Sequence, residues 1–568
     1  MTEEERRRII SEEYADGILD SKVENKSIDY FLEGGTVNTI DNTFSVVYFP
    51  VSKVLQNLSD EGAYAIIPKL FTLLDTTNLE EMGVTRVQSA TPLNLSGQGV
   101  LLGFVDTGID YTNQVFKKAD NTTRIVSIWD QTIENMQASE DIFYYGTEYT
   151  SDQINAALAS DNPISIMPST DELGHGTTLA GLAGGGPMAN ENFVGVAPQT
   201  EFVIVKLKQA KQYIRNYFFI PENVPCYQEN DIMMGLMYLS RVAERLNRPI
   251  AISIGLGSNM GGHGGRSAIG ELMTSIAGNN GIVVLTAAGN EGNAGHHYFG
   301  MIDSDNNYDT VELKVGENEN GFSMEIWGQV PGSYSIDLLS PTGEYIPRIP
   351  ARLRESRVIN FLFERTTVYV DYLIVETRTG DQLIFLRFVN PAPGIWRIRV
   401  YGGGDVTSGF HIWLPITGFI VPDTVFVKPN PYTTITAPGN ASLPITMTAY
   451  NYRTGALSLS ASRGFTRENL VKPELTAPGV DIYGPGLNNS FSTFTGTSVA
   501  TAEACGVCAL LLEWGILRGN LLSMDTLDCK KLLIRGVKRT TAEAYPNREW
   551  GFGIIDIYRT FASLRGES

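Results

Sequence analysis

The sequence has 568 residues, 43% of them hydrophobic and 10% aromatic, so it can bury a large core and form two or more folding units. It carries 43 Lys and Arg against 63 Asp and Glu, a formal net charge of −20. This charge repels nucleic acid and anionic lipid, so neither a nucleic-acid partner nor a membrane partner is expected. The start MTEEERRRII lacks the apolar centre of a signal peptide. No later stretch approaches the roughly 20 apolar residues of a membrane span, so a cytoplasmic location is expected.

Residues 1–78 contain a strand-like run at 43–50 and a helix-like run at 51–63, which predict a small, separate α+β unit. From residue 79 to about 305, apolar runs alternate with helical stretches. The runs are VLLGFVDTG (100–108), EFVIVKLK (201–208), PIAISIGLG (249–257) and GIVVLTAAGN (281–290). Apolar strands separated by helices predict an α/β domain whose parallel sheet is covered by helices on both faces.

Between 306 and 423 the pattern changes to short strands broken by Gly, Pro and Asn. That texture is typical of an antiparallel β sandwich or jelly roll. The α/β pattern resumes over 424–568 with a long apolar helix at 496–514, so the β module is predicted to be an insertion. A second insertion, at about 112–170, is polar and rich in loops.

Three short segments carry the residues that amide hydrolysis through a serine requires: a nucleophile, a base, and a group that orients the base. Asp106 ends the first apolar strand, where α/β sheets build their sites. His175 lies between two glycines in GHGTTLAG, and Ser498 starts the long apolar helix. Asn290 follows a buried strand and could aim its amide at an oxyanion. Taken singly, each has a plainer interpretation: a turn Asp, a structural His, a helix N-cap and a turn Asn.

The combination is more specific. In order, DTGID, GHGTTLAG, AAGNEGN and GTSVATAEACG resemble the four active-site segments of the subtilase family, over about 80–304 and 430–560. The resemblance implies a subtilisin-like fold in which Asp106 orients the base and His175 acts as base and then acid. It also implies that Ser498 is the nucleophile and that Asn290 forms the oxyanion hole with the Ser498 amide.

The same resemblance implies a substrate-binding groove with an S1 pocket. Its implied residues are Ser253, Ile254, Gly255, Ala287, Ala288 and Gly289. One departure follows the nucleophile, where the family usually has Ser-x-Ala-small-Pro-His and this chain has Ser498-Val-Ala-Thr-Ala-Glu503. The start of the long apolar helix and the residues packed around it could therefore differ from those of the family, although no catalytic group is lost.

Neither a metal nor a cofactor is predicted. His263, His296 and His297 lack spaced carboxylate or thiol partners for zinc, and are expected at the surface or at a pocket rim. Calcium, common in the family, cannot be assigned to particular oxygens. The glycines of SGQGVLLG precede their strand instead of following it, which argues against dinucleotide binding.

Cysteine is scarce and scattered, so no disulfide framework is expected. Cys505 and Cys508 have the spacing of a redox motif but lie in the apolar run 500–515, which predicts two core thiols.

An unsecreted subtilase with an amino-terminal unit and a jelly roll between Asn290 and Ser498 resembles the Csp germination proteases of clostridial spores. That resemblance implies a spore-associated location and a precursor of a spore cortex-lytic enzyme as the substrate. It also implies that residues 1–78 are a prodomain, cut off by the chain itself between Leu73 and Glu80, that stays bound. A general intracellular peptidase and a catalytically silent scaffold protein are the alternatives.

Overall fold

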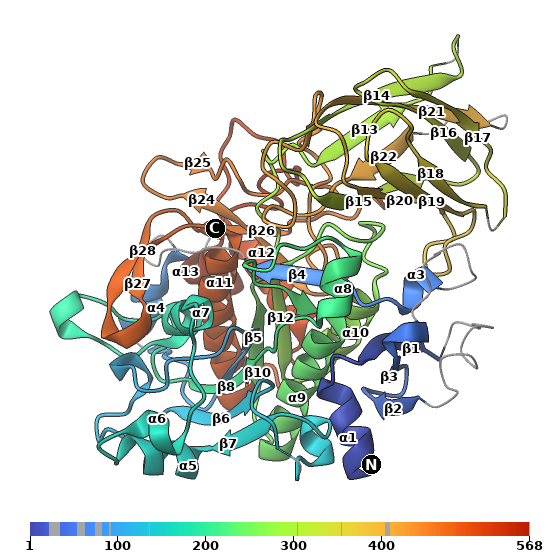
Figure 1. Cartoon of the computed structure of the whole chain (residues 1–568). Helices are drawn as coiled ribbons and strands as arrows, with labels where there is room; N and C mark the ends of the chain where they lie inside the picture. The colour runs from blue at the N-terminus through green and yellow to red at the C-terminus, as the bar shows by residue number, and fades with distance from the viewer. Residues whose placement is uncertain are drawn as a thin grey trace.

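The computed structural model places an α/β unit, a β sandwich and a small amino-terminal unit in one molecule (Figure 1). The structure describes residues 1–21, 35–53, 63–73, 82–89, 93–135, 137–303, 305–353, 355–403 and 409–566. The α/β unit comprises the described residues of 82–296 and 427–566, and the β sandwich lies between them.

A mixed sheet forms the centre of the α/β unit. Its described strands lie in the order β25-β24-β12-β10-β5-β8-β6-β7, with β26 beside β24. The bounds are β5 Leu101–Asp106, β6 Ile125–Asp130, β7 Thr147–Thr150, β8 Glu201–Lys206, β10 Ile250–Ile254, β12 Ile282–Ala287, β24 Ile445–Asn451, β25 Ala456–Leu457 and β26 Leu475–Pro478. All pairs are parallel except those of the edge strands β7 and β25. The predicted α/β fold with a parallel sheet is confirmed.

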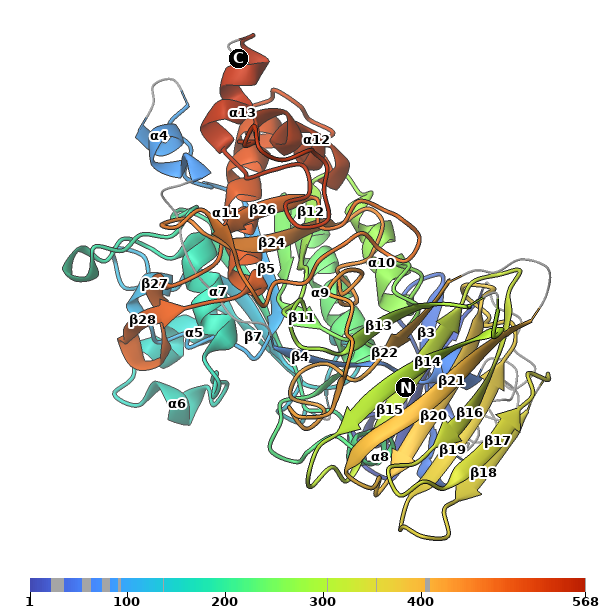
Figure 2. The ribbon, with the colours of Figure 1, turned by 90° about the horizontal axis from the view of Figure 1, so that it is seen from above.

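Helices cover both faces of this sheet because its strands are apolar on both sides. Leu102 and Phe104 of β5 pack in one cluster with α7 (His175–Gly184) and α11 (Thr497–Leu512). Leu101 and Val105, which point the other way, pack with α9 (Glu229–Leu246) and α10 (Ala268–Ala277). Figure 2 shows the sheet between these two layers. The other described α-helices of the α/β unit are α4 Val84–Ser89, α5 Ser151–Leu158, α6 Pro163–Ile166, α8 Gln212–Tyr217, α12 Thr526–Gly536 and α13 Ile557–Leu564.

The helix Thr497–Leu517, formed by α11 and the π-helical turn Glu513–Leu517, is the most apolar long helix in the described chain. By its length of 21 residues and its apolar composition alone this helix could cross a membrane, whereas no membrane span was predicted from the sequence. The most apolar 18 residues are, however, 89% buried inside the fold, as is typical of a core helix.

The β sandwich consists of two antiparallel sheets. In the described residues their orders are β13-β22-β15-β20-β19-β18 and β17-β16-β21-β14-β23. The bounds are β13 His297–Met301, β14 Tyr308–Val315, β15 Gly321–Gly328, β16 Ser333–Leu339, β17 Tyr345–Ile349, β18 Ser356–Asn360, β19 Thr367–Leu373, β20 Gln382–Val389, β21 Gly394–Gly403, β22 Gly409–Trp413 and β23 Val425–Phe426. Because β13 pairs with β22 and β23 with β14, the sandwich extends over 297–426 and is wider than the predicted 306–423.

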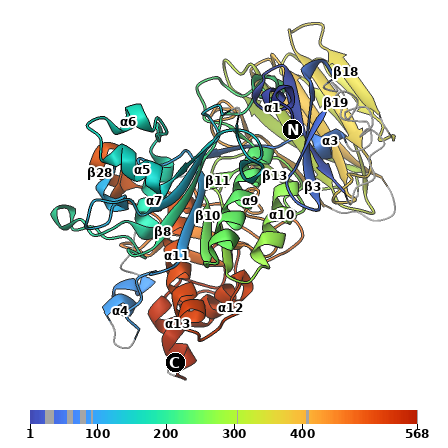
Figure 3. The same cartoon turned by 90° about the horizontal axis from the view of Figure 1, so that it is seen from below.

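The amino-terminal unit contains α1 (Glu3–Ile10) and a three-stranded sheet of β1 (Tyr14–Asp20), β3 (Phe44–Pro50) and β2 (Thr36–Thr39) in the order β1-β3-β2. β3 corresponds to the strand predicted at 43–50. Of the helix-like run at 51–63, residues 54–62 lie outside the described part. The unit packs beside α9 and α10 and next to the sandwich (Figure 3).

Buried ion pairs connect this unit to both of its neighbours. The Asp16 carboxylate contacts the Lys211 ammonium and accepts a hydrogen bond of 2.9 Å from the Asn230 amide. Arg378 of the sandwich lies 2.9 Å from the Asp20 carboxylate. After α3 (Ala63–Ile66), the chain enters the α/β unit as β4 (Leu70–Leu73).

Candidate active site

Three elements bring Asp106, His175 and Ser498 to one place at the carboxyl edge of the sheet. Asp106 is the last residue of β5, His175 the first of α7, and Ser498 the second of α11. The three residues are far apart in sequence, and the parallel topology directs their elements to the same edge.

The His175 ring bridges the other two side chains. Its Nδ1 lies 2.7 Å from Asp106 Oδ1, and its Nε2 lies 3.3 Å from Ser498 Oγ. Asp106 Oδ1 also accepts a hydrogen bond of 2.8 Å from the Thr107 amide, which fixes the carboxylate. A ring that donates from Nδ1 to the carboxylate has Nε2 available to accept the serine proton, and this is the arrangement of a base beside a nucleophile.

Glycines make this close approach possible. A Cβ on Gly255 would lie 3.1 Å from His175 Cε1 and 3.1 Å from Ser498 Cβ. A Cβ on Gly176 would lie 2.2 Å from the Gly108 carbonyl oxygen, closer than atoms can approach. Position 176 therefore requires glycine on steric grounds, which explains the glycine after His175, and a side chain at position 255 would crowd His175 and Ser498.

The start of α11 and the Asn290 side chain meet next to Ser498. Ser498 stands in the first turn of α11, where the helix dipole favours negative charge. Asn290 lies after β12, and its Oδ1 accepts bonds from the Thr497 amide (3.3 Å) and the Thr497 hydroxyl (3.2 Å). The carbonyl half of the Asn290 side chain is thus held, and the amide NH₂ is the half that can donate to an anion.

An extended segment of the chain lies beside this site. β4 forms the middle of a three-stranded sheet between β11 (Leu256–Gly257) and β9 (Tyr227–Gln228). The backbone of Leu73 pairs with Leu256, and that of Phe71 pairs with Tyr227, both antiparallel. Phe71 and Leu70 are fully buried. This is β-strand addition, the way in which an extended peptide binds a groove.

The six residues expected to bind substrate are buried at the carboxyl ends of β10 and β12, next to β11. Ser253 and Ile254 end β10, Gly255 links β10 to β11, and Ala287 ends β12 just before Ala288 and Gly289. In the described chain β4 pairs with Leu256 and Gly257, the two residues that directly follow Gly255.

Two further residues near the site were not predicted from the sequence. Asp171 accepts bonds from the amides of Gly174 (2.8 Å) and Thr177 (2.9 Å), and so holds the turn that presents His175. Asp171 could have been identified in the sequence as an acidic residue four positions before His175, since acidic residues are common near helix starts. Thr497, which holds Asn290, could have been identified only because it precedes Ser498.

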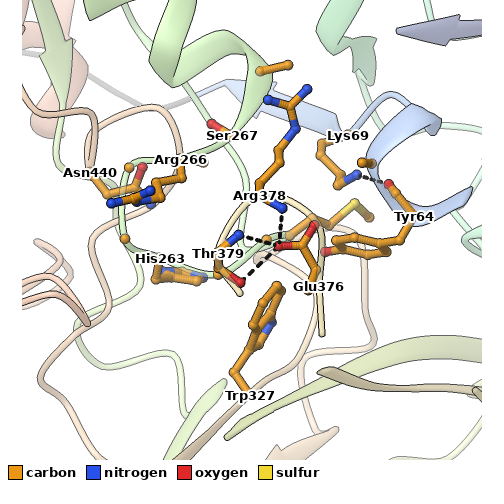
Figure 4. A pocket seen from close by; sticks show the side chains of 18 of the residues that line it. Tyr64, Lys69, His263, Arg266, Ser267, Trp327, Glu376, Arg378, Thr379 and Asn440 are labelled. Atoms are coloured by element: carbon orange, nitrogen blue, oxygen red, sulfur yellow. Dashed lines mark hydrogen bonds between the residues drawn. The ribbon is translucent and has the colours of Figure 1, made fainter. Parts of the chain in front are cut away.

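Two hollows accompany the site. An open groove of about 620 Å³ runs beside Asp106, with Thr107, Leu173, Lys206 and Tyr227 among its lining residues. At the junction of the three units, a cavity of about 40 Å³ is lined by Tyr64, Lys69, His263, Trp327 and Arg378 (Figure 4). The second volume is large enough for a few water molecules.

The histidine prediction is wrong in part. His296 and His297 are buried, and His263 is buried while lining the small cavity. His263 and His297 both stack on Trp413 of β22, with ring centres 4.0 and 4.9 Å apart, and His296 pairs with the buried Glu291. The described residues contain no group of three or more His, Cys, Asp or Glu arranged to hold a metal ion.

All four cysteines are free and buried, as expected for core thiols. Burial raises the pKa of the Cys226 thiol to about 12, so this group is not activated as a nucleophile.

Known proteins resemble this chain in sequence and in structure. A family model described as the subtilase family matches residues 97–313 and 421–553, and the gap between the two matches lies in the sandwich. The solved structure of the CspB protease of Clostridium perfringens is 32% identical, with a TM-score of 0.77, over 86% of this chain and 97% of that chain. The C5a peptidase of Streptococcus pyogenes serotype M18 is 29% identical over 178 residues, which is 29% of this chain and 15% of that protein. The chain thus spans only a small part of the curated relatives that it matches.

Proposed function

Because the chain belongs to the subtilase family, we propose that it is a serine endopeptidase that hydrolyses peptide bonds through Ser498. The observation that carries the proposal is the His175 ring, 2.7 Å from the Asp106 carboxylate and 3.3 Å from the Ser498 hydroxyl.

In the proposed reaction His175 Nε2 takes the proton of Ser498 Oγ as the oxygen attacks the substrate carbonyl. Asp106 stays ionised, holds the ring through Nδ1, and stabilises the imidazolium that forms. The same imidazolium then gives its proton to the leaving amine. A water molecule, activated in turn by His175, hydrolyses the acyl-enzyme.

The oxyanion of each tetrahedral intermediate would lie between the Asn290 amide NH₂ and the Ser498 backbone amide. Preorganised donors of this kind act mainly in the transition state, and removal of one typically costs about 10²- to 10³-fold in kcat. The hydrogen bonds from Thr497 to Asn290 Oδ1 support this role, because they orient the donor before substrate arrives.

A fluorophosphonate probe tests the proposal directly. Wild type should be labelled at Ser498, as peptide mapping by mass spectrometry would report, and Ser498→Ala should not be labelled. His175→Ala should label at a greatly reduced rate while retaining the wild-type circular dichroism spectrum. A folded wild type that remains unlabelled would instead support the scaffold-protein alternative.

We further propose that residues 1–78 are a prodomain that the chain cuts off between Leu73 and Glu80 and then keeps bound. The described β4 supports this, since its backbone already lies between β11 and β9 beside the site. Residues 74–81, which contain most of the proposed cut region, lie outside the described part. A tethered segment makes the first cleavage effectively unimolecular.

A denaturing gel distinguishes self-cleavage from cleavage by another protease. Wild type should separate into two fragments, whereas Ser498→Ala should run as one intact chain. Sequencing of the new amino terminus would report the cut. Identical patterns for the two proteins would contradict self-cleavage.

For the natural substrate we propose the precursor of a spore cortex-lytic enzyme. The similarity to the CspB protease over 86% of this chain supports this choice over a general peptidase. Purified wild type should convert the precursor at one position, while Ser498→Ala should not. A library digest with broad specificity and no precursor cleavage would favour the general peptidase.

A further inference from the structure

Glu291, the residue directly after Asn290, is a buried carboxylate that takes no part in the proposed chemistry. Its Oε2 lies 2.7 Å from Nδ1 of the buried His296 and accepts a bond of 3.0 Å from the Asn259 amide. Its Oε1 accepts a bond of 3.0 Å from the Thr417 backbone amide.

These donors come from three separate segments. Asn259 lies in the loop after β11, the strand that pairs with β4. His296 is the last residue before β13, where the chain enters the sandwich, and Thr417 lies in the segment between β22 and β23. These two parts of the chain are also joined directly, because the Leu414 amide donates to the His296 carbonyl at 2.9 Å. One carboxylate therefore ties the entry of the sandwich and the segment after β22 to the loop that carries Asn290.

Placing the charged Glu291 side chain in the interior costs free energy of folding. A buried carboxylate is unfavourable unless donors replace its water. Burial raises the pKa of Glu291, but the bonds from His296 and Thr417 outweigh it and leave the pKa below its ordinary value. The group thus stays ionised, and each of its three bonds fixes a direction as well as a distance.

The placement of Asn290 depends on both of its neighbours. Before it, the Gly289 amide donates to the Thr497 hydroxyl at 3.1 Å, and after it the Glu291 amide donates to the Ser462 hydroxyl at 3.0 Å. A backbone shift at Glu291 would therefore move the Asn290 side chain relative to Ser498. Misplacement of a catalytic donor by about 1 Å can cost on the order of 100-fold in rate.

We propose that Glu291 is a positioning residue that couples the β sandwich to the oxyanion hole by holding Asn290 in place. The inference rests on the proposed serine endopeptidase function and adds a reason for the position of the insertion. The sandwich would support catalysis through this carboxylate without contributing a group that touches substrate.

The test compares Glu291→Gln with Glu319→Gln. Glu319 also binds the segment between β22 and β23, accepting bonds from the Val421 amide (3.0 Å) and the Thr424 hydroxyl (3.1 Å), and among the described residues its hydrogen bonds go to the sandwich and this segment. Turnover of a peptide nitroanilide chosen from the wild-type library digest gives kcat and KM, with active enzyme counted by fluorophosphonate titration. Glu291→Gln should lower kcat about 10- to 100-fold with KM within about twofold, because oxyanion donors act in the transition state. Glu319→Gln should change neither by more than about twofold.

A double-mutant cycle with Asn290→Ala separates positioning from a general structural effect. If Glu291 acts through Asn290, Glu291→Gln should have almost no further effect on kcat once Asn290 is alanine. Additive losses, or a Glu291→Gln variant with wild-type kcat, would overturn the inference. The rate of self-cleavage during refolding is a second readout that needs no added substrate.

Should Glu291→Gln fail to fold, His296→Phe keeps a ring but has no side-chain donor, and it enters the same cycle with the same expected non-additivity. The two proposals fail separately. A wild type that neither labels nor cleaves would overturn the proposed function and this inference with it. An active wild type with an unaffected Glu291→Gln variant would overturn the inference alone.

Discussion

The site depends on the glycine at position 255, because any side chain there would contact both His175 and Ser498. A Cβ on Gly255 would meet Leu179 Cδ1 at 2.8 Å as well as the side chains of His175 and Ser498 at 3.1 Å. Interiors are close-packed, so such contacts are relieved only by displacement of the neighbours.

Gly255→Ala should therefore reduce kcat/KM by about 100-fold or more, because displacement of His175 by a fraction of an ångström disrupts proton transfer. The matched control is Gly278→Ala, where the nearest atom to a new Cβ is 3.6 Å away. Steady-state kinetics on both variants check the prediction, and equal activity in the two would contradict it.

A second residue-scale feature is Glu503, which is fully buried in α11 at the place where the family usually has histidine. Burial raises the pKa of its carboxyl group well above the ordinary value of 4.5. The folded protein then holds a proton that the unfolded chain loses above pH 4.5. Stability contributed by this group is therefore complete at low pH and declines as the pH rises.

Glu503→Gln removes this dependence while keeping nearly the same shape. Both proteins carry Ser498→Ala, which prevents self-digestion. The free energy of unfolding of the variant minus that of its parent should increase by about 1.4 kcal/mol for each pH unit above 4.5. The increase should stop at the folded-state pKa of Glu503. Chemical denaturation at pH 5, 6, 7 and 8 gives the difference. The exposed Glu543→Gln serves as control, and a difference that does not vary with pH would refute the assignment.

At the scale of elements, β4 is the connection between the amino-terminal unit and the site. Its Phe71 lies in the same buried cluster as Trp129, Tyr227 and Leu256 of the α/β unit. A large aromatic anchor in a closed pocket contributes much of the affinity of such an interface.

Phe71→Ala should weaken retention of the cleaved amino-terminal unit, since phenylalanine-to-alanine changes in cores cost about 3–5 kcal/mol. After self-cleavage, the variant should lose the amino-terminal fragment at a protein concentration at least about 100-fold higher than wild type does. Size-exclusion chromatography at decreasing protein concentrations measures this loss. Val37→Ala, at a position 43% exposed in the same unit, should not change retention. Equal retention by both variants would show that β4 is not the anchor.

At the scale of the molecule, the β sandwich shares a core with both other units. Trp327, Phe385 and Trp413 of the sandwich pack in one buried cluster with Leu70 of β4 and Ile214 of α8. Removal of the sandwich would expose this apolar surface to water. It would leave Asp106, His175 and Ser498 in the chain.

A chain in which a short Gly-Ser linker replaces residues 298–424 should therefore melt at a lower temperature and be digested faster by added protease. Ser498→Ala in both chains prevents self-digestion during the measurement. Unchanged melting temperature together with unchanged protease resistance would contradict a stabilising role for the sandwich.

The sequence by itself determined the α/β fold, because apolar strands and their intervening helices are local patterns that burial on both faces of a sheet imposes. It also singled out Asp106, His175, Ser498 and Asn290, since each lies in a short segment whose glycines and strand or helix ends are local requirements of the site. Their roles follow from the family resemblance and remain to be tested by the labelling experiment.

Only the tertiary structure decided which distant segments pair. The assignment of β13 to the sandwich depends on β22, more than a hundred residues later, so no local signal could extend the predicted boundary from 306 back to 297. The burial of His296 and its contact with Glu291 arise where the sandwich meets the α/β unit, and a pattern of neighbouring residues cannot report that contact. Long-range pairing is selected by the packing of whole surfaces, which no short stretch of sequence encodes.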